Sequence, residues 1–202
     1  MGHTEGYKTL RNILLSAHDL GVKFLTVYAF SAENWRRPKE EVDGLMQLIT
    51  HAAIDELDDM HKNNVRVKAS GRLTELPIEL QHALKNGIET TQNNTGITFI
   101  LAINYGGRTE ILDAVNSAIK QGEVVLTEEI LNRFLYNPDV PEPDLLIRTA
   151  GEMRLSNFLL WQSAYAELLV TQKTWPEFLP EDLKAACDEY SQRTRKFGKV
   201  AE

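Results

Sequence analysis

The chain has 202 residues, of which 43% are hydrophobic and 25% charged, and it carries a formal net charge of −7 at pH 7. This size and composition are typical of a globular protein, and we expect one domain with a sizeable core over residues 1–202. The negative charge gives nucleic acid no general electrostatic attraction, so we expect no nucleic-acid partner. The single cysteine excludes an internal disulfide and is typical of a reducing compartment, which predicts a cytoplasmic location.

The spacing of apolar residues predicts that helices and strands alternate along the chain. The first predicted helix covers residues 7–20, and a short apolar strand follows over 22–30. Further helices are predicted over 40–60, 76–91, 109–122, 127–135, 156–165 and 180–197. Further strands are predicted over 65–70, 97–103, 143–149 and 167–171. This alternation predicts an α/β fold with a central, mostly parallel sheet that is flanked by helices on both faces.

Arginines follow the ends of the first four predicted strands. They lie in the stretches "SAENWRRP", "GR", "NYGGR" and "RTAGEMRLSN". Ligands of open α/β sheets bind beyond the carboxyl ends of the strands, and guanidinium groups suit phosphate oxygens. The pattern therefore predicts a site for a phosphorylated ligand, in which Arg148, Arg154 and Ser156 could clamp a phosphate. The alternative is that single arginines pair with nearby carboxylates such as Glu33 or Glu152.

Several other kinds of site are excluded by the sequence. It contains no Walker A, G-x-G-x-x-G, H-E-x-x-H or G-x-S-x-G pattern. The acidic run from Asp55 to Asp59 falls within a predicted amphipathic helix, which favours a solvated helix face over a metal site. We find no signal peptide and no apolar run of transmembrane length.

Several motifs occur together in one order along the chain: "FSAENWRRP", "NYGGR", "PDLLIRTAGEMRLSNFLLWQSAYAEL", "WPEF" and "RTRKFG". Through them the chain resembles the cis-prenyltransferase family, the undecaprenyl diphosphate synthases and their relatives, over essentially its whole length. The resemblance implies a transferase of isoprenoid biosynthesis that condenses isopentenyl diphosphate onto an allylic diphosphate, with farnesyl diphosphate as the expected primer. Each step makes a new cis double bond, and the polyprenyl diphosphate product would serve as a cell-wall lipid carrier. It also implies Mg²⁺, a homodimer, and transient peripheral contact with the inner face of the membrane.

The resemblance further implies roles for individual residues. Asn34 matches a residue that assists proton removal from the homoallylic substrate, and Glu167 matches a magnesium ligand. Arg148, Arg154 and Ser156 match the positions that hold the diphosphate of isopentenyl diphosphate. The remaining substrate-binding positions are His3, Ser31, Ala32, Glu33, Trp35, Arg37 and Leu155.

Three features differ from the family pattern. The family's opening strand and its D-G-N-G-R-W-A loop have no counterpart in the sequence, so we expect the chain as written to be strongly impaired in catalysis. Met153 stands where some relatives carry a histidine near the metal, and residues 196–198 read Lys-Phe-Gly in place of a terminal R-x-G pattern. These departures leave open a second hypothesis, a non-catalytic partner subunit of a cis-prenyltransferase complex.

Overall fold

The structure is a computed structural model that describes the backbone of residues 2–193 and the side chains of residues 6–193. Within this range all strand pairs are parallel, as predicted. The strands are β1 (Phe24–Ser31), β2 (Arg66–Ser70), β3 (Thr98–Tyr105), β4 (Leu145–Arg148) and β5 (Glu167–Val170). The α-helices are α1 (Gly2–Asp19), α2 (Lys39–Asp55), α3 (Leu57–Lys62), α4 (Ile78–Thr91), α5 (Gly107–Lys120), α6 (Glu128–Phe134) and α7 (Pro180–Ser191). Short 3₁₀ helices are η1 (Ala32–Arg36), η2 (Leu73–Glu75) and η3 (Trp175–Glu177).

The strands are divided between two parallel sheets rather than forming one. The first sheet has the order β1-β3-β2, and the second consists of β4 and β5. Within the described range β1 therefore pairs on one side only, with β3, and β4 pairs on one side only, with β5. The α/β class with parallel strands is confirmed, but the strand pairing leaves β1 and β4 each with a free edge.

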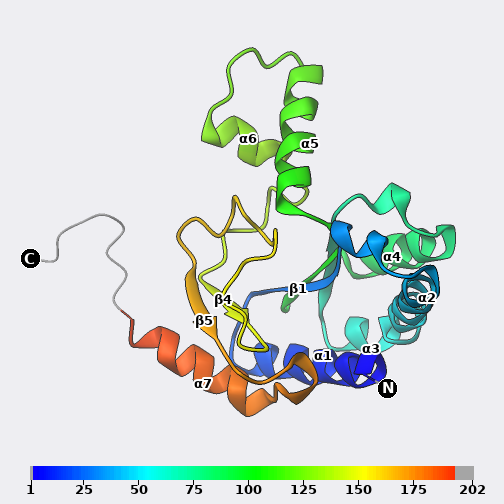
Figure 1. Cartoon of the computed structure of the whole chain (residues 1–202), viewed down its shortest axis with the longest axis vertical. Coiled ribbons are helices and arrows are strands. Elements are labelled where there is room, and N and C mark those ends of the chain that lie inside the picture. Colours follow the sequence, from blue (N-terminus) through cyan, green and yellow to red (C-terminus); the bar gives the residue numbers. More distant parts are fainter. Residues whose placement is uncertain (1, 194–202) are drawn as a thin grey trace, which may run out of the picture.

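The core is centred on β3. Its sequence "TFILAINY" is mostly β-branched, aliphatic or aromatic, and every one of its residues is buried. Because neighbouring residues of a strand point to opposite faces, both faces of the sheet are covered at β3. Figure 1 shows α2, α3 and α4 beside this sheet, α1 and α7 along one side of the molecule, and α5 and α6 extending away from the strands.

The predicted helix over 156–165 is wrong. The structure has a succession of turns there, and Ser156, Asn157 and Leu159 adopt left-handed backbone conformations, with φ of +49°, +63° and +44°. An α-helix needs negative φ at every residue, so these three interrupt it despite the helix-like spacing of the apolar side chains. The predicted long helix over 40–60 is likewise divided, with α2 ending at Asp55 and α3 beginning at Leu57.

Candidate active site

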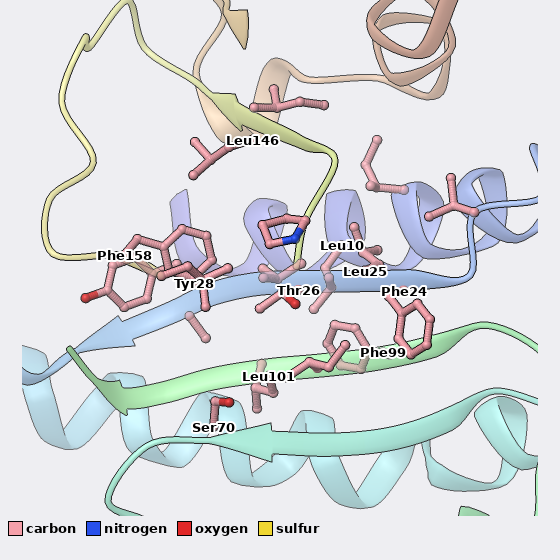
Figure 2. Close-up of a pocket in the computed structure, with 18 of the residues that line it drawn as sticks. Leu10, Phe24, Leu25, Thr26, Tyr28, Ser70, Phe99, Leu101, Leu146 and Phe158 are labelled. Atoms are coloured by element: carbon pink, nitrogen blue, oxygen red, sulfur yellow. The ribbon is translucent and has the colours of Figure 1, made fainter. Parts of the chain in front are cut away.

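A large apolar cavity lies between the free edges of β1 and β4. Its volume is about 1050 Å³, and consecutive residues of both strands line it, from Phe24 to Ala29 and from Leu145 to Arg148. Successive side chains of a strand point to opposite faces of the sheet, so a cavity that contacts every residue of a stretch runs along the edge of that strand. The edges of β1 and β4 therefore form part of the cavity wall. Helices supply much of the remainder, with Leu10 from α1 and Leu84 from α4. Figure 2 shows Leu146 across this space from the residues of β1.

Two aromatic rings lie at the carboxyl end of β1, where the apolar cavity approaches the edge of the sheet. The rings of Tyr28 and Phe158 are stacked, with centroids 4.6 Å apart (Figure 2). The Tyr28 hydroxyl donates to the backbone oxygen of Tyr105 over 3.0 Å. Burial, followed by the negative charge of Glu33, raises the pKa of Tyr28 to about 12, so its hydroxyl is neutral at physiological pH.

A smaller polar pocket lies beyond the carboxyl ends of β1 and β3. Its volume is about 490 Å³. Its lining residues are Ser31, Glu33, Arg108, Leu155, Ser156, Asn157 and Leu160. Leu155 lines both this pocket and the apolar cavity, so the two spaces adjoin at its side chain. Of the predicted substrate-binding residues, the polar pocket thus brings together Ser31, Glu33, Leu155 and Ser156.

The segment after β1 is fixed by its own hydrogen bonds. The Ser31 N–H donates to Asn34 Oδ1 over 3.0 Å, which closes the first turn of η1. The indole Nε1 of Trp35 donates to Asn104 Oδ1 over 2.7 Å. Ala32, Asn34 and Trp35 therefore belong to this segment but line neither cavity. The Asn34 oxygen already accepts a hydrogen bond and an amide is not basic, so this side chain cannot remove a proton alone.

The Glu33 carboxylate is ionised at the edge of the polar pocket. Its partial burial raises its pKa, but hydrogen bonds from Asn157 and Ser31 and the charge of Arg36 outweigh this effect, so the net pKa lies below the usual range. The Asn157 Nδ2 donates to Glu33 Oε1 over 2.7 Å. The predicted residue Arg37 lies outside the pocket, where its guanidinium pairs with Glu41 over 2.8 Å.

The predicted phosphate clamp is only partly assembled. Arg148 ends β4 and lines the apolar cavity, and within residues 6–193 its buried Nε has no hydrogen-bond partner. Ser156 lines the polar pocket. Arg154 instead forms an ion pair with Glu152 and its side chain is 67% exposed, which is the local pairing that the sequence left open.

The predicted magnesium ligand Glu167 lies away from these residues. It begins β5 opposite Leu145, whereas Arg148 is opposite Val170 at the other end of the strand pair, about 10 Å away at the rise of a strand. Its carboxylate accepts a hydrogen bond from Arg193 Nη1 over 2.9 Å. No group of three or more His, Cys, Asp or Glu side chains that could hold a metal occurs among the described residues.

Two further predictions fall at the ends of the described range. His3 lies in α1, but its side chain is outside the described residues, and so are residues 196–198. Two lining residues of the polar pocket, Arg108 and Asn157, were given no individual role by the family resemblance. The sequence pattern does point to both residues, because Arg108 is the last residue of the strand-end motif "NYGGR" and Asn157 is the last residue of the polar run after β4.

Comparison with known proteins gives a consistent family. The model of a family described as putative undecaprenyl diphosphate synthase matches residues 1–198. The chain is 51% identical over 199 residues to the isoprenyl transferase of Fusobacterium nucleatum subsp. nucleatum, covering 98% of this chain and 86% of that protein. It is 47% identical over 201 residues to the isoprenyl transferase of Thermotoga maritima, with the same two shares, 98% and 86%.

Solved structures give the same result at the level of the fold. A probable undecaprenyl diphosphate synthase from Campylobacter jejuni matches with a TM-score of 0.88 at 34% identity, over 97% of this chain and 93% of that one. Lavandulyl diphosphate synthase from Lavandula x intermedia, solved in complex with dimethylallyl diphosphate, matches with a TM-score of 0.93 at 35% identity, over 98% of this chain and 88% of that one. The chain therefore belongs to the undecaprenyl diphosphate synthase family of isoprenyl transferases.

Proposed function

We propose that the chain condenses isopentenyl diphosphate onto an allylic diphosphate, with farnesyl diphosphate as primer, and makes a cis-polyprenyl diphosphate. The observation that carries this proposal is the junction at Leu155, where the polar pocket adjoins the large apolar cavity. A prenyl diphosphate has the matching shape, with a charged head on a long hydrocarbon tail. The related lavandulyl diphosphate synthase was solved with such a molecule, dimethylallyl diphosphate.

The polar pocket suits the head group of such a ligand. The hydroxyls of Ser31 and Ser156 can donate to phosphate oxygens, and Arg108 supplies a positive charge on an exposed side chain. The negative charge of Glu33 opposes an anion, and the hydrogen bond from Asn157 stabilises this charge rather than removing it, so the hydroxyl and guanidinium donors have to outweigh it. Arg148, which lines the apolar cavity and whose buried Nε has no hydrogen-bond partner among the described residues, is a further donor.

The apolar cavity suits the growing tail. Its volume of about 1050 Å³ slightly exceeds the usual range for ligand sites, roughly 300–1,000 Å³. Each methylene group that leaves water for such a wall gains about 0.8 kcal/mol. An apolar wall also excludes water from the reacting carbon, which protects an allylic cation from hydrolysis.

These residues would support the reaction electrostatically. The C–O bond of the allylic diphosphate breaks and the diphosphate keeps the electron pair, while the allylic carbon bonds to the terminal alkene carbon of isopentenyl diphosphate. A proton then leaves the isopentenyl unit to solvent, and the new double bond forms. Hydroxyl and guanidinium donors that face the diphosphate stabilise the charge that develops on its oxygens. Asn34 would orient this proton path from η1.

Magnesium enters the proposal only as a requirement that the family resemblance implies. Mg²⁺ is commonly held by one or two carboxylates together with substrate phosphate oxygens. Glu167 is the candidate carboxylate, and its ion pair with Arg193 would have to open first.

A homodimer and transient contact with a membrane surface are further parts of the proposal. The arm formed by α5 and α6 extends from the strands (Figure 1) and carries exposed apolar side chains: Leu112, Ile119, Val124 and Val125. Such a group of side chains favours contact with a second copy of the chain. No helix in the described range is both long and apolar enough to cross a membrane.

The proposal is tested by incubating the purified chain, and a version extended by the family's opening strand and D-G-N-G-R-W-A loop, with farnesyl diphosphate, radiolabelled isopentenyl diphosphate and Mg²⁺, and by extracting labelled polyprenyl product. Replacement of Ser156 by alanine should lower kcat/KM for isopentenyl diphosphate by about tenfold, as expected for loss of a hydrogen bond to a charged group. The alternative, a non-catalytic partner subunit, is favoured by the pairing of Arg154 with Glu152. It predicts that the chain binds pyrophosphate but gives no labelled product in either form.

A further inference from the structure

Helix α5 has no side chain of its own to cap its first turn, because the residue before it is Gly106. The cap comes instead from Asn157, which is distant in sequence. The Gly107 N–H donates to the backbone oxygen of Asn157 over 2.7 Å. The Arg108 N–H donates to Asn157 Oδ1 over 2.9 Å. Two amides that would otherwise be unsatisfied at the start of the helix are thus satisfied by a single residue.

The same asparagine also contacts the segment after β1. Its Nδ2 donates to Glu33 Oε1 over 2.7 Å, so the Asn157 side chain accepts from α5 and donates to η1. Three segments of the polar pocket therefore meet at Asn157, and Ser156 is its immediate neighbour. An amide is well suited to this position, because a carboxylate has no donor for Glu33 and an aliphatic side chain has neither group.

The packing around Asn157 leaves little room for adjustment. A Cβ added to Gly106 would lie 2.6 Å from Asn157 Nδ2, and one added to Gly107 would lie 2.8 Å from the Cγ of Leu160. The φ of +63° at Asn157 is in the left-handed region, which asparagine tolerates better than most residues. The two glycines and the left-handed turn therefore let the segment fit closely against the start of α5.

We infer that Asn157 is a positioning residue, which fixes Ser156 and Glu33 relative to the start of α5 and so sets the geometry of the diphosphate-binding pocket. This inference rests on the proposed function of that pocket. Asn157 acts through its neighbours rather than on the reacting atoms. The pocket keeps its shape only while the Asn157 side chain both accepts from Arg108 and donates to Glu33.

The test is a double-mutant cycle with Asn157→Asp, Glu33→Gln and the double variant. Asn157→Asp keeps the acceptor for Arg108 but places two carboxylates together. In the double variant the introduced glutamine amide can donate to the introduced carboxylate, so the hydrogen bond returns with its direction reversed. The matched control is Asn132→Asp, which makes the same chemical change next to the same segment. Asn132 Oδ1 only accepts, from Trp161 Nε1 over 2.7 Å, and a carboxylate preserves that bond.

Three quantities are measured for each variant: the Kd for pyrophosphate by calorimetry, kcat and KM for isopentenyl diphosphate, and the midpoint of urea unfolding. We expect Asn157→Asp to raise the pyrophosphate Kd and the KM by at least about tenfold in the parent, and by no more than about threefold in the Glu33→Gln background. The Asn132→Asp variant should stay within about twofold of the parent. The unfolding midpoints show that the weakened variants are still folded.

If Asn157→Asp weakened pyrophosphate binding by the same factor in the parent and in the Glu33→Gln variant, with all variants folded, the positioning role of Asn157 would be overturned. The proposed function would be unaffected. A parent chain that fails to bind pyrophosphate would instead refute the proposed function. In that case the double-mutant cycle is evaluated from the midpoints of urea unfolding instead of from binding. Non-additive midpoints would support the Asn157–Glu33 link, and additive midpoints would overturn it.

Discussion

The buried carboxyl group of Glu110 should be a main contributor to stability near the active site. Its side chain is 2% exposed and accepts three hydrogen bonds. They come from the Tyr105 hydroxyl at 2.5 Å, the Gln162 Nε2 at 2.9 Å and the Tyr136 N–H at 3.1 Å. One side chain thus connects the end of β3, the first turn of α5, the segment after α6 and the turns that follow Ser156.

The expected cost of Glu110→Ala follows from the donors that it leaves without an acceptor. A buried donor without a partner costs about 1–3 kcal/mol. Tyr105 is fully buried and is counted in full, whereas Gln162 and Tyr136 are partly exposed and are counted at about half. The sum is about 2–6 kcal/mol, a large share of the roughly 5–15 kcal/mol that stabilises a typical domain. Glu110→Gln keeps the shape and one acceptor oxygen, so it should cost less.

The measurement is urea unfolding followed by far-UV circular dichroism. The matched control is Glu181→Ala, because Glu181 is an exposed carboxylate in the first turn of α7, as Glu110 is in the first turn of α5. The control should cost no more than about 1 kcal/mol, the usual contribution of a carboxylate at a helix N-terminus. A loss below 1 kcal/mol for Glu110→Ala would show that these donors find other partners and would refute the reasoning.

Three further predictions concern other residues. Glu167→Gln should raise the Mg²⁺ concentration needed for half-maximal turnover, and Glu189→Gln should not; identical titrations would remove Glu167 from the metal site. The Arg72 guanidinium lowers the pKa of Asp113, so their pairing stabilises the fold above the unfolded pKa of about 3.9 and is lost as pH falls through the folded pKa. Unfolding free energy should therefore fall more steeply below pH 4 in the parent than in Asp113→Asn, and parallel curves would contradict this. Leu155→Asp should weaken binding of farnesyl diphosphate more than that of pyrophosphate, because it places a charge at the mouth of the apolar cavity; equal losses would separate Leu155 from the tail site.

Much of the local structure followed from the sequence because local patterns determine it. The strand predicted over 22–30 is β1 with a shift of one or two residues, and the strand over 97–103 is β3. The division into two sheets could not be predicted, because pairing between distant strands leaves no local signal. The turns after Ser156 were missed because the close fit of Asn157 against Gly106 overrides a helix-like pattern.

The candidate site shows the same limit. Ser31 follows β1 and Ser156 comes after β4, and both line the polar pocket, although the two strands belong to different sheets. The positions of the arginines in the sequence could not show which of them face the pocket. Arg154, which was assigned to the phosphate clamp, pairs with a carboxylate two residues away, while Arg108, which was given no individual role, lines the pocket. Side-chain direction depends on tertiary neighbours, which spacing alone does not specify.

The free edge of β1 gives the molecule a built-in reporter of cavity filling. In a parallel strand the backbone N–H groups point alternately to the two sides, so one set along β1 bonds to β3 and the other faces the apolar cavity. The first set should exchange its hydrogens slowly with deuterated solvent whether or not a ligand is bound. The second set should exchange quickly until a hydrocarbon chain occupies the cavity. Amide exchange resolved residue by residue along Phe24–Ser31 would then record how far a growing product extends, without any label on the product itself.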